Sequence, residues 1–261
     1  MSKIKRGLVI ADGHTGHEVG LTPPEYDAPK GNERSLALYE LRRYSFDWLD
    51  SKLSNREYDF TIINADCIDG DGERSGGTEL IERDKNIQVD MFVCAVERWK
   101  LGHVYMSFGT PYHTGYNEQF EKQIADKLNA EKIESEGHLD INGCIINYRH
   151  HVSRSSIPHG RATPLLKAAL WNDLWSLRGE YPRANILIRS HVHYHVYAGG
   201  FDQVAFTTPA LQSYGTRFGS LIADGTVDYG FMELEIDEKG GFKWNAERLL
   251  FPLHKPQTLP K

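Results

Sequence analysis

Side chains that bind metal ions recur at five points of the sequence, each directly after a short apolar run. The five groups are Asp12-Gly13-His14, Asn64-Ala65-Asp66, Gly109-Thr110-Pro111-Tyr112-His113, His150-His151 and Ser190-His191-Val192-His193. Carboxylates and imidazoles together suit manganese, iron, zinc or nickel better than magnesium or calcium alone. These groups contain more potential ligands than the four that one tetrahedral ion needs. We therefore expect two divalent transition-metal ions, with manganese as the first choice, in a pair that clamps phosphoryl oxygens.

The most concentrated group is the stretch RSHVHYH at residues 189–195, which follows the apolar run 185–188. If that run is a strand that continues through the histidines, His191, His193 and His195 project from the same side, because strand side chains alternate. We expect His191 and His193 to reach the metals. For His195, a place behind a ligand and a hydrogen-bonded role away from the site both stay open.

The elements that must position these groups alternate along the chain. Short apolar runs predict buried strands at residues 7–11, 60–63, 104–108, 144–148 and 186–188. Between them, helical spacing of apolar residues predicts helices at 33–53, 78–99, 117–128 and 164–177. Alternating strands and helices indicate a layered α/β domain, in which the carboxyl ends of the strands gather on one rim. The five metal-competent groups should meet there.

The rest of the chain indicates a single domain over residues 1–261, because no repeat, low-complexity tract or linker interrupts it. Residues 203–207 predict another strand. Residues 230–252 alternate apolar and polar side chains around a Lys-Gly-Gly turn and predict a C-terminal β-hairpin. The Pro- and Gly-rich segment 15–32 lies between the first strand and the first helix, and a loop of that length is expected at the active site.

Composition narrows the class of protein. The net charge is −6, and no run of Lys or Arg exceeds two residues, so a strong nonspecific nucleic-acid footprint is absent. No apolar stretch approaches a membrane span, and the amino terminus does not resemble a secretion signal. Three widely spaced cysteines argue against a disulfide framework. We expect a cytoplasmic protein that does not bind membranes.

The order of these motifs resembles the calcineurin-like metallophosphoesterase family. That family's pattern is Asp-x-His, Gly-Asp-x-x-Asp/Gly, Gly-Asn-His-Asp/Glu, a strand-end His and Gly-His-x-His, and the match here spans residues 12–193. The stretch GHTGHEVGLTPP at residues 13–24 further resembles phage- or prophage-encoded members, which would place the protein in a host cytoplasm. The resemblance implies a four-layer α/β fold, a two-sheet β-sandwich flanked by helices.

The resemblance also implies roles for individual residues. Asp12, His14 and His193 would bind the first ion, Asp66 would bridge both ions, and His191 would bind the second. His150 is the favoured further ligand of the second ion, with His151 as the alternative, because one residue of strand register decides between them. Asp69 would either orient a ligating histidine or cap a turn.

The third motif departs from the family pattern, because Gly-Asn-His-Asp is replaced by the residues GTPYH at 109–113. Thr110 stands where the family has an asparagine ligand, and His113 lies two residues beyond the position of the histidine that protonates the leaving group. Two alternatives follow. Thr110 completes the second metal site and His113 is the general acid, or His113 itself binds the ion.

Further polar residues near these motifs could contact substrate. His17 and Arg34 flank the Pro- and Gly-rich segment and could bind phosphate, or they could serve as a loop residue and an ion pair at a helix start. Either Arg154 or Arg161 could clamp phosphate through its planar guanidinium. Tyr112 could stack on a base or sugar, or pack inside the fold.

These observations lead to an expected enzyme, a hydrolase that cleaves phosphate esters with a hydroxide activated by two metal ions. Asp66 and His113 are its expected catalytic residues, and phosphodiesters, in a nucleotide or nucleic acid, are its expected substrates. A phosphomonoesterase or nucleotide phosphatase is the alternative. A metal-binding scaffold of the same fold without activity is a third, less favoured reading.

Overall fold

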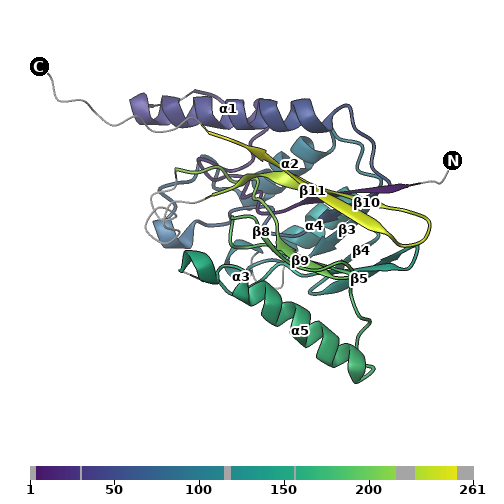
Figure 1. Cartoon of the computed structure of the whole chain (residues 1–261). Helices are drawn as coiled ribbons and strands as arrows, with labels where there is room; N and C mark the ends of the chain where they lie inside the picture. Colours follow the sequence, from purple (N-terminus) through teal and green to yellow (C-terminus); the bar gives the residue numbers. More distant parts are fainter. Residues whose placement is uncertain (1–3, 30, 115–118, 156, 216–226, 252–261) are drawn as a thin grey trace, which may run out of the picture.

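The computed structural model describes residues 4–29, 31–114, 119–155, 157–215 and 227–251. Two mixed sheets lie against each other, and helices flank them (Figure 1). The first sheet has the strand order β11-β10-β1-β2-β3-β4, with bounds β1 Lys5–Ile10, β2 Phe60–Ile63, β3 His103–Ser107, β4 Lys132–Glu134, β10 Tyr229–Ile236 and β11 Phe242–Leu249. The second has the order β5-β6-β7-β9-β8, with bounds β5 Gly137–Ile141, β6 Cys144–Tyr148, β7 Ile186–Arg189, β8 Val196–Gly199 and β9 Val204–Thr207. The predicted α/β sandwich is confirmed.

The helices carry most of the outer cover of the two sheets. They are α1 Glu33–Leu53, α2 Lys85–Val96, α3 Pro111–Thr114, α4 Gln119–Lys127 and α5 Thr163–Leu177, with short 3-10 turns at η1 Pro24–Tyr26, η2 Glu73–Ser75 and η4 Pro158–Gly160. Helix α1 begins after Asn32, whose side chain accepts a hydrogen bond from the Ser35 amide at 3.1 Å and so caps a free helix-end donor. Figure 1 shows α1 and α5 on opposite outer sides of the molecule.

Alternation along β1 explains the layers. Leu8 and Ile10 belong to a buried cluster that includes Phe46 and Leu49 of α1. Val9, between them in sequence, points the other way and belongs to a cluster with Ile186 of the second sheet. On the far side of the second sheet, a third cluster packs α5 against its strands through Leu165, Leu187 and Ala205. Helix, sheet, sheet and helix therefore form four layers.

Parallel pairing brings the metal-competent groups to one rim. In the first sheet β1, β2 and β3 run parallel, and in the second β6, β7 and β9 do so. Each of β1, β2, β3, β6 and β7 is followed directly by one of the five groups. The carboxyl ends of parallel strands lie at the same edge of a sheet, so the pairing explains the convergence.

Several elements differ from the sequence expectation. The helix predicted at 78–99 begins only at Lys85. Residues 78–84 form a turn, an isolated bridge at Leu80 and irregular backbone, and Asp84 caps the helix by accepting from the Asn86 amide at 2.8 Å. Strand β7 ends at Arg189, so the histidines of residues 191–195 lie in a loop and not on one face of a strand. Strands β4, β5 and β8 are short or edge strands that the apolar runs do not reveal. Residues 117–118 of the predicted third helix lie outside the described ranges.

The Pro- and Gly-rich segment 15–32 divides into two parts. Residues 15–23 are buried, and the Ser213 amide donates to the carbonyl of Val19 at 2.8 Å. Residues 24–29 are more exposed, and Asp27 in this part pairs with Arg42 and Arg43 of α1 at 2.8 and 3.0 Å. The first part therefore belongs to the packed interior, and the second lies along α1.

Across the described ranges, no helix is long and apolar enough to cross a membrane.

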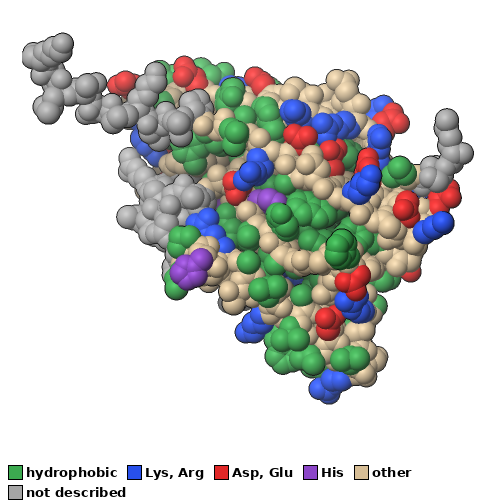
Figure 2. All heavy atoms as spheres, in the orientation of Figure 1, with side chains coloured by type: hydrophobic (Ala, Val, Ile, Leu, Met, Phe, Trp, Pro, Cys, Tyr) green, Lys and Arg blue, Asp and Glu red, His purple; other side chains and the backbone are tan. Residues whose placement is uncertain are grey.

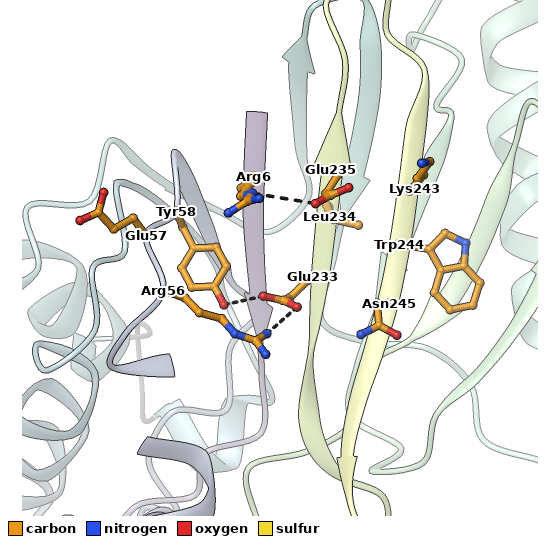
Figure 3. Close-up of a pocket in the computed structure, with 10 residues that line it drawn as sticks. All are labelled: Arg6, Arg56, Glu57, Tyr58, Glu233, Leu234, Glu235, Lys243, Trp244 and Asn245. Carbon is orange, nitrogen blue, oxygen red and sulfur yellow. Dashed lines mark hydrogen bonds and ion pairs between the residues drawn. The ribbon is translucent and has the colours of Figure 1, made fainter. Parts of the chain in front are cut away.

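A cavity of about 480 Å³ lies beside Arg6, near the amino end of β1 (Figure 3). Asp12 follows the carboxyl end of the same strand. Its central carboxylate, Glu233, accepts a hydrogen bond from the Tyr58 hydroxyl at 2.7 Å and pairs with Arg56 at 2.6 Å. These partners already satisfy the carboxylate, so we assign no site to this cavity.

Candidate metal centre

Asp12, His14 and His193 form the first group of ligand atoms. Nε2 of His193 lies 3.3 Å from Oδ1 of Asp12 and 3.2 Å from Nε2 of His14. The three ligand atoms lie within 4.8 Å of one another, close enough to bind one ion together, and Asp12 and His14 are buried. Donors of this kind in this number suit a divalent transition metal.

Asp66, His150 and His191 form the second group. Nε2 of His150 lies 2.8 Å from Oδ2 of Asp66, and Nδ1 of His191 lies 3.8 Å from the same oxygen. The two groups adjoin, because Oδ1 of Asp12 is 3.9 Å from Nε2 of His150. That spacing makes Asp12, as well as Asp66, a carboxylate that two neighbouring ions could share.

The backbone at this rim is strained where the ligands lie. Among the described residues, six of the eight non-glycine positions with positive φ belong here: Asp12, His14, Ala65, Asp66, His191 and His193, with φ between 43° and 75°. Such conformations cost free energy, of order 1–3 kcal/mol each, and persist where the surrounding structure holds them. The Asp12 amide donates to the carbonyl of Ala65 at 3.0 Å, and the His14 amide donates to that of Asp66 at 3.0 Å. The loops after β1 and β2 hold each other in place.

The electrostatics of the two groups favour a bound cation. Burial opposes ionisation of Asp12, but His193 and His150 outweigh it and lower the pKa of this carboxyl. Burial opposes ionisation of Asp66 as well, and His150 and His113 hold its pKa well below the usual range. At His150 burial acts to lower the pKa, but Asp66 and Asp12 raise it to about 10. Two buried carboxylates thus favour positive charge at Nε2 of His150, where a proton and a metal ion compete.

Two buried polar atoms test whether metal ions fit. Within the described part of the chain, Oδ1 of Asp12 and Nε2 of His150 form no hydrogen bond of good geometry, and their near neighbours are other potential ligands. Oδ1 of Asp12 lies 3.3 Å from Nε2 of His193, and Nε2 of His150 lies 2.8 Å from Oδ2 of Asp66. Buried polar atoms are nearly always satisfied, so an unsatisfied pair calls for an explanation. Both atoms belong to the two groups described above and come from residue types that ligate metals, Nε2 of His150 once it has released its proton. The residues present therefore fit divalent ions at this position.

Outer partners orient the histidines. Oδ1 of Asp69 lies 3.2 Å from Nδ1 of His14, which leaves Nε2 of His14 facing Asp12 and His193. Nδ1 of His150 lies 2.7 Å from the carbonyl oxygen of Asn64, which leaves its Nε2 facing Asp66. A carboxylate or carbonyl behind a histidine is the usual arrangement around a protein-bound metal, because it sets the tautomer and the ring direction.

The GTPYH motif divides between the two groups. Oγ1 of Thr110 donates to Oδ2 of Asp66 at 2.9 Å and lies 3.1 Å from Nδ1 of His191, so it adjoins the second group. His113 is buried on the side of the first group, with its ring centroid 4.4 Å from that of His14 and its Nδ1 2.9 Å from the carbonyl oxygen of Asp69. Burial lowers the pKa of His113 to about 4.

Glu121 is a site residue that the sequence reasoning missed. This fully buried carboxylate on α4 accepts hydrogen bonds from the amides of Asp66 at 2.9 Å and Gly109 at 2.8 Å. Burial, and then the neighbouring Asp66, raise the pKa of Glu121 to about 8. Gly109 is required here, since a Cβ at this position would lie 2.1 Å from Oδ1 of Asp66. The only signal in the sequence was an acidic residue on the apolar side of a predicted helix.

Three of the residues considered for substrate contact or ligation contact other side chains among the described residues. His17 is buried, and its Nε2 lies 3.6 Å from a carboxylate oxygen of Glu79. Arg34 pairs with both carboxylate oxygens of Glu18, at 2.5 and 2.9 Å. His151 is exposed, with its ring 4.9 Å from that of His191, and lies outside the two ligand groups.

Each of the remaining candidates is exposed or contacts a residue outside the two ligand groups. Tyr112 is half-buried and packs on the His113 ring, with centroids 3.8 Å apart. Arg154 is exposed, and the Arg161 guanidinium lies over the Tyr194 ring at 4.4 Å. His195 lies away from the ligands, with its Nδ1 2.7 Å from the carbonyl oxygen of Thr207.

No protein-family model matches the sequence, and no curated protein is similar to it by sequence. Solved structures are similar in fold. An archaeal phosphodiesterase is 9% identical with a TM-score of 0.46, over 93% of this chain and 99% of that one. Wild-type Vps29 complexed with zinc, from Entamoeba histolytica, is 11% identical with a TM-score of 0.40, over 93% and 98%. A predicted phosphoesterase from Streptococcus pneumoniae is 10% identical with a TM-score of 0.39, over 95% and 100%. Function must therefore be argued from the side chains.

Proposed function

We propose that this chain is a metal-dependent phosphoesterase that hydrolyses phosphodiesters. The observation that carries the proposal is the pair of adjoining ligand groups. In these groups Oδ1 of Asp12 and Nε2 of His150 are buried, lie 3.9 Å apart and form no hydrogen bond of good geometry within the described ranges. Buried carboxylates without Lys or Arg beside them are costly unless cations compensate. Among the described residues, Asp12 and Asp66 form ion pairs with histidines.

Each ion has a proposed set of ligands. Asp12, His14 and His193 hold the first ion, and Asp66, His150 and His191 hold the second, with the Thr110 hydroxyl at its edge. We expect manganese first, with iron, zinc or nickel as substitutes, because mixed carboxylate and imidazole sites accept all four.

The chemistry follows from these ligands. When bound, two such cations clamp phosphoryl oxygens and lower the pKa of a water that attacks phosphorus. His113 is the proposed proton donor to the leaving oxygen. Because burial lowers the pKa of His113 to about 4, this role requires that the negative charge of a bound phosphate raise that pKa, so that the ring carries a proton on Nε2 as well as on Nδ1. General acid catalysis of this kind contributes about 10²–10⁴ in rate. Its hydrogen bond to the Asp69 carbonyl keeps the ring fixed beside His14.

The substrate is proposed to be a phosphodiester of a nucleotide or nucleic acid. The rim is open on one side, since the side chains of His191 and His193 are 29% and 19% exposed. An open rim accepts a phosphate with a substituent on each side. A phosphomonoesterase is the alternative that the assay below separates.

The test compares three substrates with the full chain in added manganese: bis(4-nitrophenyl) phosphate, 4-nitrophenyl phosphate and single-stranded DNA. We expect hydrolysis of the two diesters above that of the monoester. Asp66→Asn should abolish turnover, whereas Asp71→Asn, the same change at an exposed carboxylate, should not. Preference for the monoester would overturn the diesterase assignment, and turnover of none of the three would favour a scaffold without activity.

A further inference from the structure

A second cavity, of about 390 Å³, adjoins the metal centre. It lies between α5 and the ends of β5, β6 and β7, and His151 on its wall is 4.9 Å, ring to ring, from the candidate ligand His191. None of the proposed metal ligands lines this cavity. Its volume falls in the range of small-molecule sites, which is about 300–1,000 Å³.

The cavity is cationic in a chain whose net charge is −6. Its lining includes Arg149, Lys167 and Arg189, against one carboxylate, Glu136. Glu136 lies 3.5 Å from Arg149 and 3.9 Å from Arg189, so it compensates two guanidinium groups only in part. The local charge favours an anionic ligand.

Arg189 is the most informative of these cations. Its side chain is only 3% exposed, one of its terminal nitrogens donates to the carbonyl of Ile188 at 2.7 Å, and its Nε has no hydrogen-bond partner within the described ranges. Burial lowers the pKa of Arg189 to about 9. A buried guanidinium with an unused donor is costly to the fold alone, and an anion in the cavity would offset that cost.

Aromatic rings form much of the remaining wall. Trp171 and Trp175, one turn apart on α5, are stacked with centroids 5.9 Å apart and an angle of 25°. Tyr181 stacks on His138 at 5.3 Å and 22°. Trp171 and Tyr181 remain 49% and 47% exposed, so their surfaces are open to a ligand. Flat exposed rings beside cations are what unpaired nucleotides bind.

We propose that this cavity binds a nucleotide unit, with its base against Trp171 and Tyr181 and its phosphate at Arg149, Lys167 and Arg189. The inference rests on the proposed phosphodiesterase function, since the neighbouring phosphate of the same substrate would then lie at the metal centre. The nucleotide can come from a single strand of nucleic acid or from a mononucleotide, because both present the same base and phosphate.

A competing explanation involves the apolar side of α5. Leu166, Leu170 and Leu174 are also exposed on this helix, and Figure 2 shows hydrophobic side chains gathered over α5. A second copy of the chain could cover such a surface, and Trp171 would then be a dimer contact. The cationic lining favours the nucleotide, because an apolar contact between copies gains nothing from three cations beside a single carboxylate.

The experiment measures fluorescence anisotropy of a fluorescein-labelled ten-residue oligothymidylate with the full chain, in EDTA so that hydrolysis does not interfere. Trp171→Ala should weaken binding by about 5- to 150-fold, the range for loss of one base-stacking ring, and Trp171→Phe should retain most of it. Arg149→Gln should also weaken binding and reduce its salt dependence. The matched control is Tyr44→Ala, an equally exposed aromatic residue on α1, across the molecule from α5 (Figure 1).

Competition identifies the source of the nucleotide. Displacement of the probe by thymidine 5′-monophosphate supports a mononucleotide site, and displacement only by oligonucleotides supports a strand. Displacement by inorganic phosphate as effective as that by the monophosphate would overturn the base-binding assignment. So would equal affinities for Trp171→Ala and Tyr44→Ala, or a change in oligomeric state of Trp171→Ala that leaves its affinity for the probe unaltered.

The same preparations separate this inference from the proposed function. Hydrolysis of bis(4-nitrophenyl) phosphate in manganese, without binding of the oligonucleotide, would refute the cavity assignment alone. Binding that depends on Trp171, without hydrolysis of any phosphodiester, would refute the proposed function and leave the nucleotide cavity supported.

Discussion

The Thr110 hydroxyl contacts two of the three proposed ligands of the second ion, so its removal tests that site. It donates to Oδ2 of Asp66 at 2.9 Å and lies 3.1 Å from Nδ1 of His191, while the Thr110 amide separately donates to Oδ1 of Asp66 at 2.6 Å. Thr110→Val removes the hydroxyl, keeps the amide and nearly keeps the shape. A hydrogen bond to a charged group contributes about 1.5–3 kcal/mol, which corresponds to about a 10- to 150-fold loss in affinity for the second ion.

Calorimetric titration of the metal-free chain with manganese measures this loss. We expect two binding steps in the unaltered chain. In Thr110→Val we expect the second step to be weakened. Thr110→Ser keeps the hydroxyl and should bind both ions as the unaltered chain does. The first step should not change, because the Thr110 hydroxyl, which is the group removed, contacts Asp66 and His191 of the second group. Two unchanged steps in Thr110→Val would refute a role for the hydroxyl, and equal weakening of both steps would indicate that the rim itself has collapsed.

Three further predictions concern neighbouring residues. Gly109→Ala places a Cβ 2.1 Å from Oδ1 of Asp66, so it should abolish hydrolysis and cost about 1–3 kcal/mol of unfolding free energy, measured by urea titration. Asp69→Asn removes the carboxylate behind His14 and should weaken the first manganese step about 10- to 100-fold by calorimetry. Burial lowers the pKa of His113 to about 4, so its contribution to stability is full above pH 6.5 and is lost as pH falls toward 4. His113→Gln should therefore lose about 3 kcal/mol less than the unaltered chain over that interval, by denaturant titration in EDTA. Parallel pH profiles would count against the burial of this ring.

Strand order was enough to bring much of the candidate site together. Asp12, Asp66 and His191 each follow a buried apolar run, and the carboxyl ends of parallel strands meet at one edge, so their proximity follows from the alternation of strands and helices. What the pattern could not supply is backbone conformation. Strand β7 ends before His191, and this residue takes a φ of 75°. The loop, and not strand alternation, sets the direction of its side chain.

The pattern of strands and helices could not predict contacts between residues distant in sequence. The choice between His150 and His151 depends on a hydrogen bond from the His150 ring to the carbonyl of Asn64, 86 positions away. Glu121 accepts hydrogen bonds from the amides of Asp66 and Gly109, and the sequence of its own helix predicts neither partner. Burial of a charged or polar side chain is set by tertiary packing, which a single sequence does not display.

Metal analysis of the purified full chain tests the central claim most directly. After reconstitution with manganese and removal of free ion, we predict about two equivalents bound per chain, one at the Asp12 cluster and one at the adjoining Asp66 cluster. A third cluster of potential ligands, formed by His14, Asp69 and His113, shares His14 with the first and is not expected to hold an ion of its own. His150→Ala should retain about one equivalent, while His103→Ala, an exposed histidine away from the rim, should retain both. A content below about half an equivalent in the unaltered chain would contradict the binuclear centre and the phosphoesterase function with it.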